Sequence, residues 1–341
     1  MHNKKLLAFA AFFACTVAAH AQSSVTATGL VDMYVGSLKA PGDTGRNNVV
    51  GSGGMTTSWF GFKGTEDLGG GLKANFALTG FMRADTGTPG RFDGDNFWSR
   101  DALVSLSGNF GAVTLGRTVA PNFVPTISMN PFGDSFTFSP LVLHQNVSLF
   151  NQSGWRASNP SDTGWSNQII YSSPKIGGFS GNLHYQFGEQ ANQHNKNNVG
   201  LNASYASGPF AVTAFYEDVS MKNPVPSVLS ESHKNWMLGA SWDAGFAKAY
   251  ATYGQTTGKD TDYKIKTASL GATVPLAANS RILAAYAHSK LADSTAKRDT
   301  VSVGYNYDFS KRTDGYAIVM YDKVKSYSSG TGFGVGVRHR F

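Results

Sequence analysis

Cysteine is almost absent from this chain, since Cys15 is the single example among 341 residues. Cys15 lies in a stretch that we expect to be removed, so the mature chain would contain no thiol. A lipoprotein site is the alternative use of Cys15, but the preceding "FFA" makes a poor lipobox. Without a thiol, disulfides, thiolate metal ligands and cysteine nucleophiles are excluded together.

The N-terminus has the pattern of a secretory signal peptide. Lys4 and Lys5 precede the uncharged apolar run Leu6 to Ala19, and "AHA" follows directly before Gln22. A basic start, a short apolar core and an A-x-A site are typical of a cleaved signal. We therefore expect cleavage after Ala21, so that residues 1–21 are lost and residues 22–341 form a single domain.

The chain also lacks long hydrophobic runs and clustered charge. After the signal no apolar run approaches the ~20 residues of a membrane helix, and no long segment has a 3.6-residue apolar period. Charged residues make up only 15%, and the net charge of +7 falls to +5 when two lysines leave with the signal. The remaining basic residues are scattered rather than clustered, which argues against nucleic acid as a partner.

Glycine and aromatic residues are abundant, with 39 Gly, 23 Phe and 14 Tyr. Short segments of alternating apolar and polar residues recur along the whole chain, separated by turn-forming residues, as β-strands with two different faces do. We count 16 such segments, from Ser23 to Ser37 at the start to "GFGVGVRHRF" at the end. The fold class is therefore all-β.

The connections between these segments alternate in length. Short ones such as "PKIGG", "DAG" and "PLAAN" alternate with longer polar ones, namely Lys39 to Thr56, Glu189 to Asn197, Ser220 to His233 and Thr256 to Asp262. An even number of antiparallel strands with short turns at one end and long loops at the other is typical of a transmembrane β-barrel, whose closure pairs every backbone group. A soluble β-sandwich also alternates along each strand, and alternation alone does not exclude it.

The last strand ends on an aromatic residue with no polar tail. Phe333, Val335, Val337, His339 and Phe341 share one face, and the other face is small or basic. In a closed barrel this strand needs no tail, because its partner is the first strand, which we expect it to meet near Val25. The Phe341 ring would then lie in the aromatic girdle at the periplasmic interface.

Several segments resemble the general porins of the beta-proteobacterial, neisserial type. The matching stretches follow the family order over nearly the whole mature chain: "GFKGTEDLGGGLKA", "LSGNFGAVTLGR", "YSSPKIGGFSGNLHYQFGE", "YDFSKRTDGYA" and "GVGVRHRF". The resemblance implies a 16-stranded barrel that works as a homotrimer among the lipid and lipopolysaccharide of the outer membrane. It also implies passive diffusion of small hydrophilic solutes and ions without a cofactor, and it makes Phe341 part of a signal for the outer-membrane assembly machinery.

The resemblance also implies that the third long loop folds into the lumen and narrows it. The longest irregular stretch, Thr118 to Gly164, lies after the fifth strand, where that loop belongs. Its "NPFGD", Asn130 to Asp134, holds turn chemistry that could fold it back. A loose surface loop is the alternative.

A pore of this kind needs charges facing one another across a narrow gap, where little water screens them. The wall candidates are Lys63, Arg83, Arg100 and Arg117, and Asp134 is the acidic candidate on the loop; each could instead be an ordinary solvated charge. By the resemblance, Trp59 replaces a usual basic residue and Thr79 a usual glutamate. The remaining cations predict modest selectivity for anions.

Enzymatic chemistry finds little support in the sequence. His184, His288 and His339 are scattered without a coupled Ser or Asp, and the H-E-x-x-H, G-x-S-x-G and P-loop patterns are absent. His144 and His194, in predicted loops, are expected to be solvated rather than metal ligands. A ligand-specific channel and an adhesin or structural barrel are the two alternatives to a general diffusion pore.

Overall fold

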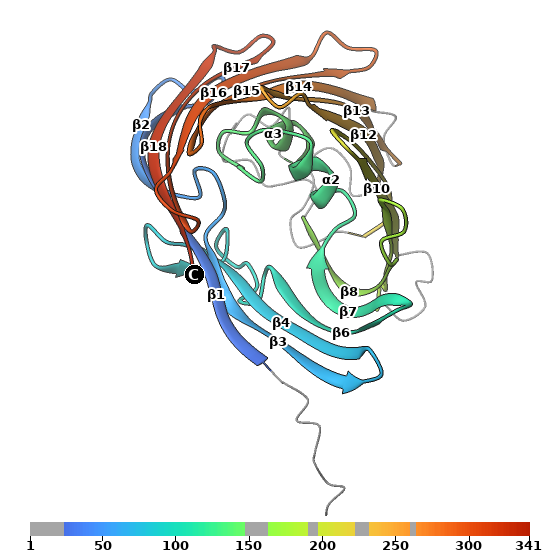
Figure 1. The fold of residues 1–341 in the computed structure, drawn as a ribbon. Coiled ribbons are helices and arrows are strands. Elements are labelled where there is room, and N and C mark those ends of the chain that lie inside the picture. The colour runs from blue at the N-terminus through green and yellow to red at the C-terminus, as the bar shows by residue number, and fades with distance from the viewer. Residues whose placement is uncertain (1–23, 147–162, 190–196, 222–231, 260–263) are drawn as a thin grey trace, which may run out of the picture.

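The computed structural model describes residues 24–146, 163–189, 197–221, 232–259 and 264–341, which form one ring of antiparallel strands (Figure 1). The predicted signal peptide and His194 lie outside these ranges. The strands are β1 (Ser24–Lys39), β2 (Asn47–Ser52), β3 (Trp59–Gly69), β4 (Leu72–Arg83), β5 (Thr88–Pro89), β6 (Asp101–Gly108), β7 (Gly111–Val119), β8 (Gly164–Ser172), β9 (Phe179–Gln186), β10 (Asn198–Ser207), β11 (Phe210–Val219), β12 (His233–Asp243), β13 (Lys248–Gly258), β14 (Lys264–Ala277), β15 (Ser280–Leu291), β16 (Lys297–Asp308), β17 (Thr313–Val324) and β18 (Gly330–Arg340).

The ring is a closed barrel of sixteen strands. The short strand β2 pairs with β1 and the two-residue β5 with β4, and the sheet of 18 strands less these two leaves the 16 that were predicted. Closure runs through β1, which pairs with β3 on one edge and with β18 on the other. The closing register joins Leu30 to Arg340, so the last strand meets β1 some five residues beyond the expected Val25.

The two faces of the barrel differ as the alternation predicts. On β18 the outward Val335 and Val337 are about half exposed, at 50% and 51%, while Gly336 between them is buried. Successive strands are joined by tight turns at one end, for example residues 244–247, and by longer segments at the other, for example 84–100. An exposed apolar face is stable in lipid rather than water, so a soluble sandwich does not fit.

The polar composition of Lys39 to Thr56 predicted a single long loop. The structure differs, because this segment contains the short strand β2. After β2 the chain leaves the wall at Gly53, whose φ of +80° suits glycine, and returns at Trp59. Residues 53–58 therefore form an inward bulge opposite β1, which we call the wall bulge. The backbone N–H groups of Met55 and Thr56 donate to the Asp32 carboxylate at 2.8 and 2.7 Å, which replaces the missing ladder bonds.

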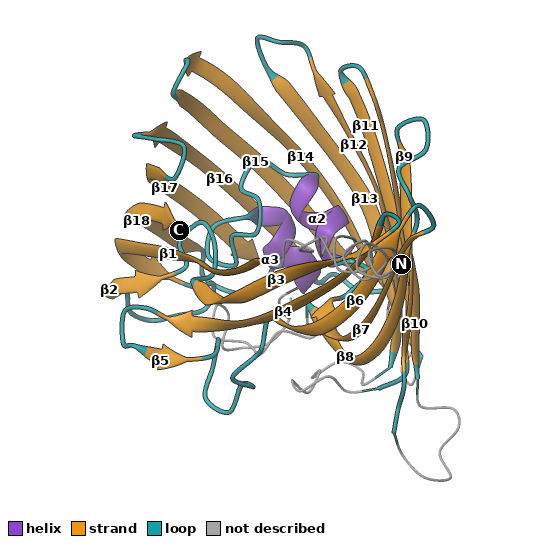
Figure 2. Cartoon of the chain, turned by 60° about the horizontal axis from the view of Figure 1, so that its bottom comes forward, coloured by secondary structure: helices purple, strands orange, loops and turns teal. Residues whose placement is uncertain are grey.

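Two short helices lie inside the ring of strands, where Figures 1 and 2 both show them. They are α2 (Phe123–Ser128) and α3 (Pro140–Asn146), and both belong to the long segment after β7. Between them, Phe132 and Phe138 are fully buried against inward residues of β15 and β17. Residues 120–146 thus pack against the inner wall rather than forming a loose surface loop, whereas 147–162 lie outside the described ranges. No helix in the described part of the chain is long and apolar enough to cross a membrane.

Candidate functional site

Trp59, Lys63 and Arg100 form an aromatic and cationic group on the inner wall. Phe60 and Phe62 point outward, with 37% and 45% exposed, so alternation along β3 puts Trp59 and Lys63 on the lumen face. The Arg100 guanidinium carbon lies 4.1 Å from the centroid of the Trp59 ring, and the Lys63 Nζ lies 5.6 Å from it. Trp59 is therefore a lumen residue that orients two cations through its ring face, rather than a girdle residue.

Asp101, which sequence reasoning missed, supplies a carboxylate beside Thr79. The two residues are directly opposite each other in the β4–β6 register, and the Thr79 hydroxyl donates to Asp101 Oδ2 at 2.7 Å. The Thr118 hydroxyl donates to Oδ1 at 2.7 Å, and Arg100 Nη1 completes the set with an ion pair at 2.6 Å. An acid thus remains at this place in the wall although the expected glutamate position is a threonine.

Arg117 and Arg83 have different surroundings from the Trp59 group. Arg117 is buried, and its guanidinium donates to the Ser99 carbonyl at 2.7 Å and to Ser166 Oγ at 2.9 Å. These bonds tie β7 to β8 and to the segment before β6. Arg83 pairs at 2.7 Å with Asp93, a solvent-exposed residue of the segment between β5 and β6.

Asp95, close to these residues, forms a strong ion pair with Arg91. The Arg91 Nε and Nη2 donate to its two oxygens at 2.8 and 3.0 Å. Burial raises the pKa of Asp95, but the hydrogen bonds and charge of Arg91 lower it more, so the net shift is below the usual 3.8. The carboxylate therefore stays ionised and holds the segment after β5 in place.

Asp134 lies where the long segment meets the wall bulge. The Thr56 hydroxyl donates a hydrogen bond to Asp134 Oδ1 at 2.8 Å. The same hydroxyl oxygen accepts a hydrogen bond from Arg338 Nη1 at 2.8 Å. Desolvation raises the pKa of Asp134 above its usual 3.8, although the Thr56 hydrogen bond and the charges of Arg338 and Arg100 act in the opposite direction. The predicted loop acid is therefore near cations from two parts of the wall.

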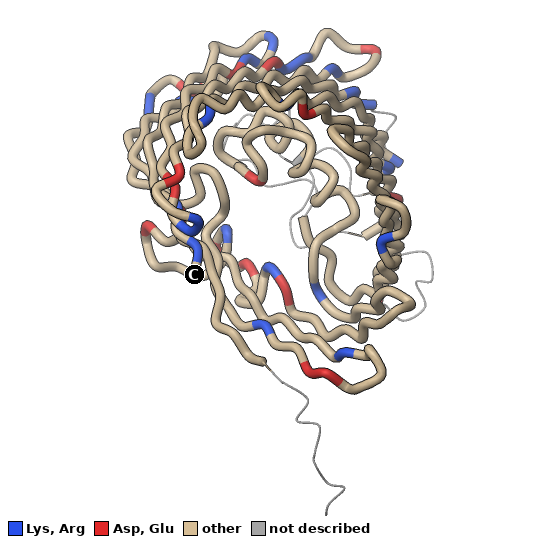
Figure 3. The backbone as a smooth tube through the Cα atoms, in the orientation of Figure 1, with Lys and Arg blue, Asp and Glu red and all other residues tan. Residues whose placement is uncertain are grey.

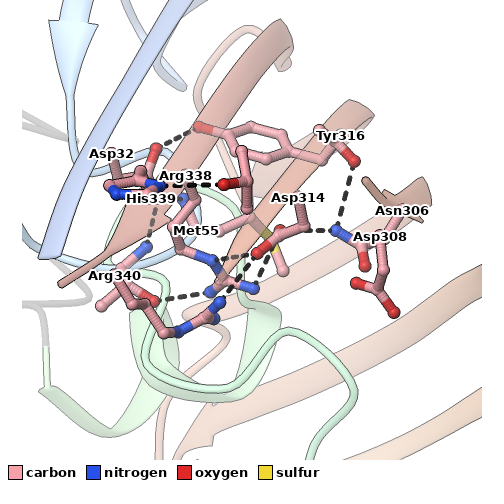
Figure 4. A network of polar contacts seen from close by, with 12 residues as sticks. Asp32, Met55, Asn306, Asp308, Asp314, Tyr316, Arg338, His339 and Arg340 are labelled. Carbon is pink, nitrogen blue, oxygen red and sulfur yellow. Dashed lines mark hydrogen bonds and ion pairs between the residues drawn. The ribbon is translucent and has the colours of Figure 1, made fainter. Parts of the chain in front are cut away.

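Arg338 is the centre of a second charged group, which Figure 4 shows. It lies directly opposite Asp32 of β1 and Asp314 of β17 in the strand register. Its Nε and Nη2 both lie 3.1 Å from Asp314 oxygens, and Arg340 Nη1 reaches Asp314 at 3.0 Å. Tyr316 donates its hydroxyl to Asp32. The basic inner face of the last strand was the sequence signal for this group, but its partners were not foreseen.

His144 was expected to be solvated, and this was wrong. It is buried in α3, with Nδ1 at 2.8 Å from Ser289 Oγ and Nε2 at 2.8 Å from Thr300 Oγ1. Desolvation and the nearby Arg298 charge lower the pKa of His144 well below 6.5, so the ring is neutral. It anchors α3 to the wall. In the described ranges no three His, Cys, Asp or Glu residues are grouped to hold a metal ion.

The shape of the barrel and the chemistry of its two faces define the class of protein. A closed antiparallel barrel with an apolar outer face, a polar inner face, and short turns at one end is a transmembrane channel of an outer membrane. Its lumen holds charged groups on the wall and on a segment folded against that wall.

Comparison with known proteins identifies the family. A profile described as "Gram-negative porin" matches residues 7–327. The chain is 32% identical to outer membrane porin protein 32 of Delftia acidovorans, over 99% of this chain and 100% of that protein. It is 27% identical to the major outer membrane protein P.IB of Neisseria meningitidis serogroup A, over 83% of each.

A solved structure, an anion-selective porin from Comamonas acidovorans, superposes with a TM-score of 0.79 at 28% identity, covering 94% of this chain and 100% of that one. The chain therefore belongs to the Gram-negative porin family. It is a multi-pass protein of the outer membrane, and its barrel is a passive channel.

Proposed function

We propose that the channel favours anions modestly and that its constriction lies between the Trp59 group and the segment that carries Asp134. One observation carries this proposal: in the ion pairs that Arg100 and Arg340 form on the inner wall, the cation is more exposed than the acid. Arg100 is 28% exposed against 10% for Asp101, and Arg340 is 43% exposed against 3% for Asp314. Permeating ions therefore meet positive ends, while the carboxylates are covered by hydrogen bonds.

The six predicted constriction residues would have different tasks. Lys63 and Arg100 supply the exposed positive charge, Trp59 orients both, and Asp134 supplies the opposing negative charge. Arg117 and Arg83, with their partners in the wall and the neighbouring segment, support the constriction from behind. Small hydrophilic solutes and anions are the proposed cargo, and the channel needs no cofactor and catalyses no reaction. Its family membership and the anion-selective relative support this assignment.

Further proposals concern maturation and assembly. Residues 1–21 are a cleaved signal, and the barrel works as a homotrimer, as the family resemblance implies. Phe341 is part of the recognition signal for the assembly machinery. Its backbone N–H and carbonyl exchange two 3.0 Å bonds with Gly29, and its ring is 49% exposed on the outer side, where another protein could read it during assembly.

Single-channel recording in a salt gradient tests the selectivity. The expected reversal potential has the sign of modest anion preference, and a strong cation preference would contradict the electrostatic argument. Liposome swelling with solutes of graded size separates a general pore, which has a smooth size cutoff, from a ligand-specific channel, which saturates. Negligible conductance would favour an adhesin or structural barrel.

A further inference from the structure

The outer face of the barrel carries a row of lysines at the end with the long loops. Lys266 of β14 is directly opposite Lys290 of β15, and Lys290 is directly opposite Lys297 of β16. The row continues by one strand, because Lys325, just after β17, donates its backbone N–H to the carbonyl of Lys297 at 2.9 Å. We call these four residues the lysine row. In Figure 3 both basic and acidic segments lie along this part of the ring.

The neighbours of these lysines show that the row faces outward. Thr267 and Ser289 are buried and hydrogen-bonded to each other at 2.7 Å, and Ser289 also contacts His144 inside the barrel. Arg298 is buried and donates to the carbonyl of Leu143 in α3. Because side chains alternate along a strand, the lysine next to each inward residue points away from the lumen. All four lysines of the row are exposed.

The described residues leave the row with little compensating charge. Like charges directly opposite each other on adjacent strands destabilise a sheet. Within the row, Lys297 forms an ion pair with Asp299 at 3.9 Å. Asp299 also accepts a hydrogen bond from Tyr286 at 2.6 Å and pairs with His288 at 2.8 Å.

Elsewhere at the same end of the barrel, two other lysines are paired with an acid. Lys234 and Lys259 share Asp218. In the part of the chain that the structure describes, the lysine row therefore differs from this pair of lysines.

The position of the row fits the headgroup level of the outer leaflet. The end with long loops faces the cell surface in barrels of this class. Directly below the row, the same outward face is apolar and exposed at Leu270, Tyr286, Val301 and Tyr321, which suits acyl chains. A molecule with anionic groups above and acyl chains below would contact both surfaces.

We propose that the lysine row binds the phosphate groups of a phosphorylated lipid headgroup, that of the lipopolysaccharide leaflet. Lysine is a point-charge donor to phosphate. Adjacent strands are about 4.8 Å apart, so four strands place the outermost lysines of the row roughly 14 Å apart. A headgroup with two phosphates can therefore contact lysines at both ends. The proposal rests on the location of the barrel in the outer membrane, not on its selectivity.

The test uses the purified, folded porin in detergent and titrates it with bisphosphorylated lipid A, counting bound lipid by native mass spectrometry. The triple variant Lys266→Gln, Lys290→Gln, Lys297→Gln should bind roughly 100-fold more weakly, on the basis of about fivefold per lysine near a charged lipid surface. The matched triple variant Lys234→Gln, Lys259→Gln, Lys311→Gln removes equal charge and should keep wild-type affinity. Replacing the three row lysines by arginine should also preserve binding.

Two further arms identify what is recognised. Lipid A without its phosphates should bind the wild type and the row variant equally weakly. Millimolar inorganic phosphate should compete poorly, because it lacks the acyl chains. Equal loss of binding in both glutamine triples, or full competition by inorganic phosphate, would overturn the proposal. The row variant should retain wild-type conductance and heat-modifiable migration, which shows that it is folded and separates this test from that of the channel.

Discussion

Removal of the Arg100 charge should shift the channel toward cations by an amount that can be estimated. An ion passing about 6 Å from a unit charge in water-like surroundings feels about 0.7 kcal/mol. With a screening length of about 10 Å at 0.1 M salt, this falls to about 0.4 kcal/mol. Local anion concentration should then fall about twofold and cation concentration rise about twofold. We therefore expect Arg100→Ala to lower the anion-to-cation permeability ratio by about three- to fourfold.

The salt dependence gives this prediction its sharpest test. At 1 M salt the screening length is about 3 Å, and the same change should alter the ratio by less than about 1.5-fold. Reversal potentials of single channels in salt gradients measure both values. Arg100→Lys keeps the charge and should keep the ratio, and Arg312→Ala removes an exposed charge from the turn between β16 and β17. A shift in Arg100→Ala that does not shrink with salt, or an equal shift in Arg312→Ala, would refute the reasoning.

Four further changes have defined outcomes. Trp59→Arg should move the reversal potential toward anions, and no movement would mean that the Trp59 group does not line the narrow part. Because the pKa of Asp134 is raised above its usual 3.8, Asp134 should lose its negative charge before the pH has fallen to 3.8. The preference for anions should therefore rise on acidification in the wild type. It should not rise in Asp134→Asn. Gly54→Ala would place a Cβ 2.1 Å from the Tyr316 hydroxyl; it should lower the midpoint of heat modification, consistent with an overpacking cost of about 1–3 kcal/mol, and an unchanged midpoint would contradict that packing. Deletion of Phe341 should reduce outer-membrane levels far more than it changes the conductance of refolded protein, and normal surface levels would refute its assembly role.

Most of the barrel was predictable because its pattern is local. On β12 the alternating Trp236 and Leu238 are exposed while Met237 is buried, and this difference is written directly in the order of residues. Strand number and the alternation of turn lengths follow from the same reading. The sixteen strands and the closing role of the last strand were therefore found without a structure.

The charged site was harder to predict from the sequence, because its contacts join distant parts of the chain. Asp101 becomes a partner of Arg100 through the register of β4 with β6, and Arg338 meets Thr56 across 282 positions. The stretch "GSGGMTTS" has the composition of a surface loop, and it turns inward because Asp32 and the segment near Asp134 bind it. Likewise, the burial of His144 depends on hydroxyls of β15 and β16 that no local pattern connects to it.

The wall bulge also makes the barrel adaptable in length at an unusual place. Inserting one residue into a β-strand normally turns every later side chain to the opposite face, which would put polar groups into lipid. Here the ladder of β1 with β2 ends at Met33 and Ser52, and the ladder with β3 begins anew at Leu30 and Trp59. Residues can therefore be added or removed between 53 and 58 without reversing either ladder, so variation within the wall itself, and not only in the surface loops, can reshape the interior of the pore.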